Sequence, residues 1–120
     1  MSSPLHLSRQ TDLDHAISET TDEALVLFKH SLTCDRSADA YREVLQLCRE
    51  LPDLKVAMIT PQRDRELCDE MAERFGVVHH TPQVLLIRNG AVTWHARHWG
   101  VTADAVKQAL DTSSATPSGR

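Results

Sequence analysis

An unbroken apolar run from Ala24 to Phe28 most constrains what this chain can fold into. Apolar and polar residues do not alternate in it, which is typical of a central strand that is covered on both faces. A second run follows from Leu54 to Ile59, interrupted only by Lys55. Between them, apolar residues at helical spacing predict a helix from about Asp35 to Glu50, which Pro52 ends. Two strands joined by a helix are expected to be parallel, with a right-handed crossover.

The rest of the chain adds a short edge strand, further helices and a hairpin. In order, the pattern predicts a strand at 5–8, a helix starting at 11–12, a helix over 64–75, strands at 83–88 and 91–96, and a helix that Thr102 caps. Asn89-Gly90 is a strong two-residue hairpin signal. These elements predict an α/β protein with the thioredoxin architecture: a central mixed β-sheet, of parallel strands plus a C-terminal antiparallel hairpin, flanked by helices.

Length and charge limit the classes of function. The chain has 120 residues, enough for one modest core, and we expect one domain over 1–111 with a disordered tail over 112–120. Its net charge is −4, with Lys and Arg scattered singly, which argues against a nucleic-acid partner. It has no run of about 20 apolar residues and no signal-peptide core, so we expect a cytoplasmic protein with no membrane partner.

Cys34 lies where the first buried strand gives way to a helix. Backbone N–H groups at a helix start have no intrahelical partners, and the macrodipole adds partial positive charge. Both effects favour thiolate over thiol, so a cysteine here can act as a nucleophile near neutral pH. Ser37 stands three residues on, where a dithiol motif carries its second cysteine, which indicates one-thiol redox chemistry. The alternative is a buried, inert cysteine, which the polar neighbours disfavour.

The other two cysteines are expected to belong to the core. Cys48 lies about 21 Å from Cys34 along the same predicted helix, too far for a disulfide. Cys68 lies on the apolar side of the second long helix, where burial makes a thiol inert. A resolving role for Cys68 stays open as the less favoured alternative.

Three pieces of sequence, within residues 5–110, carry a family resemblance. They are Lys29-His30-Ser31-x-Thr33-Cys34-x-x-Ser37; Phe75-Gly76-Val77 with Thr81-Pro82-Gln83-Val84-Leu85-Leu86-Ile87 and Asn89-Gly90; and Trp94-His95 with His98-Trp99 and Thr102. Together they resemble the YtxJ-type monothiol bacilliredoxins, thioredoxin-like proteins of the bacillithiol system. One position departs from the pattern: Asp35 follows the cysteine where Pro or a small residue is expected. Its carboxylate is expected to raise the pKa of the Cys34 thiol, and Arg36 to offset that effect in part.

The resemblance implies an enzyme that removes bacillithiol from S-bacillithiolated client proteins. Cys34 would attack the sulfur of bacillithiol, the client thiol would leave, and a second low-molecular-weight thiol or another redoxin would release the cap. Such exchange needs no metal and no tightly bound cofactor, and bacillithiol is the co-substrate. The resemblance also implies a cis bond at Thr81-Pro82, opposite the cysteine, whose backbone would hydrogen-bond an incoming thiol chain.

Further candidate residues surround the motif. Trp99 and Gly100 are expected to line a pocket for the thiol, and the helix start at Thr102 to receive the malate carboxylates of bacillithiol. For Trp99, half-buried packing is the alternative. Lys29 and His30 are candidates for stabilising the thiolate, although Lys29, at a strand end, is also consistent with facing solvent.

Two motif residues and the histidines complete the candidates. Thr33 is expected among the thiol-binding residues, and Ser37 either donates a hydrogen bond to the Cys34 sulfur or is only a first-turn residue. His79, His80, His95 and His98 lack the spacing of a metal site, so no metal is expected.

Alternatives of a different class remain. One is a thioredoxin-like module without turnover, in which Cys34 senses or docks. Another is a monothiol redoxin that uses a different low-molecular-weight thiol, because thioredoxin-like folds serve many chemistries. A third is an iron–sulfur cluster shared between two chains, as some monothiol glutaredoxins assemble with glutathione.

Overall fold

The computed structural model describes residues 4–21, 23–31, 35–78 and 80–115, with the backbone alone at 35–37 and 112–115. Thr33, Cys34 and His79 lie outside the described residues, and Ser37 is described only by its backbone in the first turn of a helix. The candidate site therefore consists of described residues that flank Cys34 in the sequence and of the elements around the end of β2.

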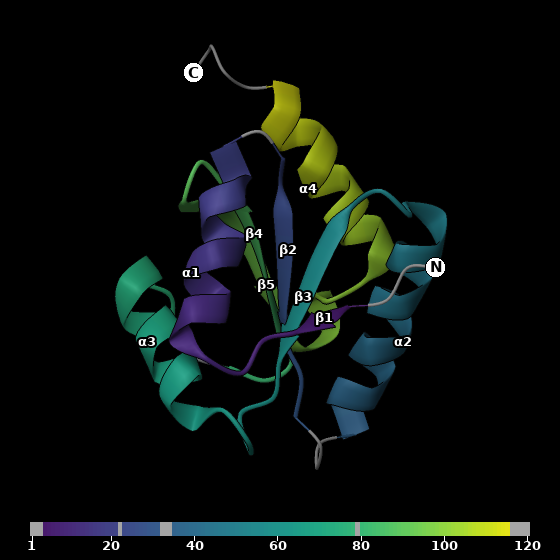
Figure 1. Cartoon of the computed structure of the whole chain (residues 1–120). Coiled ribbons are helices and arrows are strands. Elements are labelled where there is room, and N and C mark those ends of the chain that lie inside the picture. The colour runs from purple at the N-terminus through teal and green to yellow at the C-terminus, as the bar shows by residue number, and fades with distance from the viewer. Residues whose placement is uncertain (1–3, 22, 32–34, 79, 116–120) are drawn as a thin grey trace.

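The centre of the molecule is a five-stranded mixed sheet (Figure 1). Its strands are β1 (Leu5–His6), β2 (Leu25–Lys29), β3 (Lys55–Ile59), β4 (Gln83–Arg88) and β5 (Ala91–Arg97), in the order β1-β3-β2-β4-β5. β1 and β2 each pair with β3 in parallel, whereas β4 pairs antiparallel with both β2 and β5. The predicted mixed sheet with a C-terminal antiparallel hairpin is confirmed.

Helices cover both faces of the sheet, as the unbroken apolar runs predict. They are α1 (Gln10–Ser18), α2 (Asp35–Glu50), α3 (Arg65–Phe75) and α4 (Ala103–Ala115), with short 3-10 turns η1 (Glu19–Thr21) and η2 (His98–Gly100). Figure 1 shows α1 and α3 on one side of the sheet and α2 and α4 on the other. Successive strand residues point to opposite faces, so Phe28 packs in the core under α2 and α4 while Leu27 packs under α1 and α3.

Two segments differ from their predicted form. The last helix continues to Ala115. Residues 112–115, which the sequence pattern assigns to the disordered tail over 112–120, are therefore helical. Ser and Thr are only mildly unfavourable inside a helix, and no proline lies between the start of α4 and Pro117. The residues between β5 and α4 include the single turn η2, which the sequence pattern does not predict.

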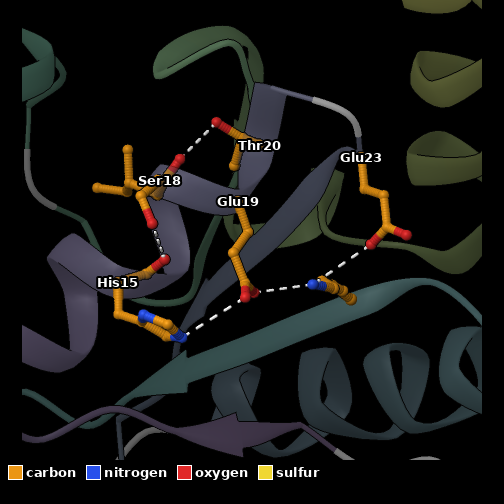
Figure 2. Close-up of polar contacts among 7 residues, drawn as sticks. His15, Ser18, Glu19, Thr20 and Glu23 are labelled. Atoms are coloured by element: carbon orange, nitrogen blue, oxygen red, sulfur yellow. Dashed lines mark hydrogen bonds and ion pairs between the residues drawn. The ribbon is translucent and has the colours of Figure 1, made fainter.

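A buried threonine holds the hairpin turn between β4 and β5. The Thr20 hydroxyl donates to the Ile17 carbonyl at 2.7 Å (Figure 2) and accepts from the Gly90 N–H at 2.8 Å. The Asn89 N–H donates to the Thr20 carbonyl, also at 2.8 Å. Asn89 and Gly90 have φ of 52° and 75°, the left-handed values that a tight hairpin turn needs.

Charged side chains tie the end of α1 to the start of β3. The Lys55 ammonium lies 2.8 Å from a Glu19 carboxylate oxygen and 3.3 Å from one of Glu23, and His15 lies 3.5 Å from Glu19 (Figure 2). The Lys55 hydrogen bond lowers the pKa of Glu19. These groups are exposed, so each pair contributes little to stability.

Among the helices that the structure describes, none combines the length and apolarity that crossing a bilayer requires.

Candidate functional site

The carboxyl end of β2 meets a cis proline. Lys29, the last residue of β2, pairs with Ile59 of β3 on one side and with Gln83 of β4 on the other. The Thr81–Pro82 peptide bond, immediately before β4, is cis as predicted. Because β2 and β4 are antiparallel, the chain leaves β2 toward Cys34 at the same edge where the proline enters the sheet.

The residues that directly follow β2, His30 and Ser31, are held by both main-chain and side-chain hydrogen bonds. The His30 N–H donates to the Ile59 carbonyl at 2.9 Å, which extends the pairing with β3 by one residue. Ser31 is buried, and its hydroxyl accepts a hydrogen bond from the Gln62 amide at 2.8 Å. The sequence does not identify Gln62 as a partner of Ser31, because a polar residue in the loop before α3 is not a distinctive pattern.

Lys29 is fully buried, which corrects the alternative that it faces solvent. Its strand is central, flanked by β3 and β4 with helices on both faces, so its end is covered. Burial lowers the pKa of Lys29, and Cys68 and Asp69 of α3 oppose that effect. The structure therefore places a basic group in a low-dielectric setting at the end of the strand that leads to Cys34.

His30 belongs to a row of stacked rings. Its imidazole centroid lies 5.5 Å from that of Phe28 and 4.9 Å from that of Tyr41 on α2. Stacked rings of this kind favour a fixed orientation. His30 is thus positioned by the core under α2, while Lys29 belongs to the opposite face of the sheet.

The 3-10 turn η2 packs on the cis-proline segment and carries an exposed tryptophan. The His98 N–H donates to the Pro82 carbonyl at 2.9 Å. Trp99 follows and is 68% exposed, so the alternative of half-buried packing does not describe it. A Cβ on Gly100 would stand 3.4 Å from the Ala96 methyl group, an ordinary van der Waals distance, so the packing of η2 on β5 does not itself require glycine at this position.

The start of α4 is capped as predicted, but its amides already have partners. The Thr102 hydroxyl accepts from the Ala105 N–H at 3.1 Å. A carboxylate oxygen of Glu43, on α2, accepts from the Ala103 N–H at 2.8 Å. Two of the N–H groups expected to receive a ligand carboxylate are thus satisfied within the protein.

Cys48 and Cys68 are core residues, as predicted. They are 2% and 0% exposed. Burial raises the pKa of both thiols, that of Cys68 to about 11, although Lys29 lowers it in part. Burial therefore disfavours the thiolate form of both residues, which agrees with their expected place in the core.

The histidines after α3 and β5 gather around an arginine. The His80 and His98 rings are 5.5 Å apart, and the Arg97 guanidinium lies 2.6 Å from Nε2 of His80. Within the described part of the chain, no three His, Cys, Asp or Glu side chains come together as metal ligands would.

Two of the pockets that the described residues form border the sheet. The larger, about 550 Å³, lies beside β1 and the first residues of β2 and β3, and none of the predicted site residues lines it. The smaller, about 440 Å³, lies beside Gln83 and Arg97, next to the cis proline. The second pocket therefore adjoins the site and the first does not.

Comparisons with known proteins agree with this geometry. Residues 5–106 match the sequence model of a family described as Monothiol bacilliredoxin BrxC. A solved structure described as having a thioredoxin fold is 27% identical, with a TM-score of 0.82, over 89% of this chain and 93% of that chain. Thioredoxin from Trypanosoma brucei brucei is 15% identical with a TM-score of 0.79, over 96% of this chain and 94% of that chain. Thioredoxin from Fasciola hepatica is 17% identical with a TM-score of 0.71, over 93% of this chain and 99% of that chain. The last two likenesses concern the fold alone.

Proposed function

The chain belongs to the monothiol bacilliredoxin family of thiol oxidoreductases, and from that membership we propose that it removes bacillithiol from S-bacillithiolated client proteins. The family match spans the Cys34 motif, and this observation carries the proposal. The cis Thr81–Pro82 bond at the carboxyl end of β2 supports it, because that is where the chain leads into Cys34.

The reaction is a thiol–disulfide exchange. The Cys34 thiolate attacks the bacillithiol sulfur of the mixed disulfide; the bond to the client sulfur breaks, and a bond between Cys34 and bacillithiol forms. The client thiolate leaves and takes up a proton. A second low-molecular-weight thiol, or another redoxin, then attacks the cap on Cys34 and regenerates the enzyme. Ser37 replaces a second active cysteine, and Cys48 and Cys68 are buried, so the protein does not resolve itself.

Two features are proposed to favour the Cys34 thiolate. The first is the start of α2, at Asp35, which follows the cysteine directly and contributes partial positive charge. The second is Lys29, because a charge acts more strongly in a buried setting than in water. His30 is a further candidate, and its stacked ring has a fixed place beside Tyr41.

The binding of the thiol is proposed to use the cis-proline segment and η2. Thr81 and Pro82 would align the disulfide through their backbone, and Trp99 would cover it from the exposed side. Thr33, Ser37, Gly100 and Thr102 remain proposed thiol-binding residues. Bacillithiol is the co-substrate, with no tightly bound cofactor.

The proposal is tested with a client protein that carries one bacillithiol disulfide. Wild type should free the client thiol, so that the intact mass of the client falls by one cap, and Cys34→Ser should leave it capped. Cys48→Ser and Cys68→Ser serve as matched controls and should both remain active. An active Cys34→Ser variant would disprove the assignment.

One observation favours a second candidate, a binding or sensing module without turnover. Asp35 places a carboxylate directly after Cys34, which disfavours the thiolate. Iodoacetamide alkylation of Cys34 against pH separates the two. A pKa well below the free-cysteine value of about 8.5 supports exchange chemistry, whereas an unshifted or raised pKa supports the module.

A further inference from the structure

A small pocket lies between the segment that follows α3 and the end of β5. Its volume of about 440 Å³ is in the range of small-molecule sites. His80 and Gln83 line it from one side, and His95 and Arg97 from β5. It adjoins the proposed site: Gln83 directly follows the cis proline, and Arg97 directly precedes His98, whose N–H binds the Pro82 carbonyl.

Basic groups gather in this pocket although the protein as a whole carries a net charge of −4. Arg97 is permanently charged, and no Asp or Glu is among the described residues that line the pocket. Because arginine only donates hydrogen bonds, the 2.6 Å contact makes Nε2 of His80 the acceptor. The pKa of His80 is lowered by burial and then by Arg97, His98, Lys29 and His95. The local field therefore favours an anion.

Gln83, one of the residues that line the pocket, carries an unsatisfied acceptor. The residue is 1% exposed, and its amide nitrogen donates to the Val78 carbonyl at 3.0 Å. Its amide oxygen Oε1 is buried and has no hydrogen-bond partner among the described residues. Buried acceptors are normally paired, so this one points to a ligand that brings a hydroxyl or N–H group.

We propose that this pocket binds the carboxylate-bearing part of the low-molecular-weight thiol, with Arg97 pairing a carboxylate and Gln83 accepting from a hydroxyl or N–H group. The inference rests on the proposed function and adds a specificity determinant to it. Arg97 has five N–H donors, so it can bind a carboxylate while it keeps its contact with His80. This places the ligand carboxylate near β5 and away from the start of α4, where Glu43 already occupies the Ala103 N–H.

Kinetics with two disulfides test the proposal. For Arg97→Gln we expect the KM for a bacillithiol mixed disulfide to rise about tenfold, as loss of one charged hydrogen bond implies, with kcat little changed. The KM for hydroxyethyl disulfide, which has no carboxylate, should not change. Arg49→Gln, an equal loss of charge on the exposed end of α2, is the matched control and should behave as wild type. An equal rise with both disulfides, or no rise with either, would overturn the proposal.

Binding without turnover separates this proposal from the enzymatic one. NMR titration of His80 in the presence of reduced bacillithiol should show its pKa rising, because a bound carboxylate favours the protonated ring. The shift should disappear in Arg97→Gln, and it requires no exchange activity. If His80 does not respond in wild type, the pocket proposal fails even if the exchange reaction is found. If Arg97→Gln impairs only the removal of caps from acidic clients, the pocket recognises the client protein and not the low-molecular-weight thiol, and the proposal is wrong.

Discussion

Replacement of Lys29 by methionine separates the charge of this buried residue from its packing. Its side chain is fully buried, and its four methylene groups contribute about 0.8 kcal/mol each, or about 3 kcal/mol together. Methionine keeps most of that apolar stem and removes the ammonium, which burial disfavours. At pH 7 we expect Lys29→Met to be at least as stable as wild type, and Lys29→Ala to lose about 2–3 kcal/mol of unfolding free energy.

The stability difference between Lys29→Met and wild type should also change with pH in a direction that can be checked. The folded-state pKa of Lys29 lies below its unfolded value of about 10.4. Between these two values the unfolded state binds more protons, so wild-type stability rises with pH there. The advantage of Lys29→Met should be full below the folded-state pKa and shrink as pH approaches about 10.4. Urea denaturation across that range measures it, and an advantage that grows with pH would refute the assignment of a buried, destabilised ammonium.

Activity completes the test of Lys29. If its charge favours the Cys34 thiolate, each unit of pKa corresponds to a tenfold change in the thiolate equilibrium, and we expect Lys29→Met to free client thiols about tenfold more slowly at pH 7. Its alkylation profile should move to higher pH. A variant that folds and keeps both the wild-type rate and the wild-type profile would show that Lys29 does not act on the thiolate.

Three further outcomes are expected. Thr20→Val removes a buried hydroxyl that makes two hydrogen bonds, so its unfolding free energy in urea should fall by about 2 kcal/mol. The control Ser18→Ala, which removes an exposed hydroxyl, should stay within about 0.5 kcal/mol of wild type, and equal losses would refute the role of burial. Cys68→Ala should keep full transfer activity because burial raises the pKa of this thiol to about 11, and lost transfer would instead identify a resolving cysteine. Trp99→Ala should raise the KM for the capped client several-fold, and an unchanged KM would place the thiol elsewhere.

Much of the fold follows from local sequence features. The apolar runs at 24–28 and 54–59 predict buried parallel strands, and the structure confirms them. Gly76, with φ of 65°, ends α3 where a left-handed residue is expected. The structure confirms the cis Thr81–Pro82 bond. The prediction of this bond rests on the family resemblance, since the local sequence alone favours trans.

The rest depends on contacts between distant residues. Lys29 is buried because its strand lies at the centre of the sheet. The residues next to Lys29 in the sequence do not predict this strand order. Glu43 binds the Ala103 N–H across 60 positions, and Gln62 binds Ser31 across 31, so neither contact has a local pattern. The pocket at Arg97 arises in the same way, from the meeting of the segment after α3 with the end of β5.

The destination of the bacillithiol cap tests the central claim most directly. A capped client is mixed with the fully reduced protein in the absence of any other thiol, and the products are mapped by peptide mass spectrometry. We predict the cap on the peptide that contains Cys34, together with a free client thiol. A cap on Cys68, or a disulfide between Cys34 and the client itself, would contradict attack by Cys34 on the bacillithiol sulfur.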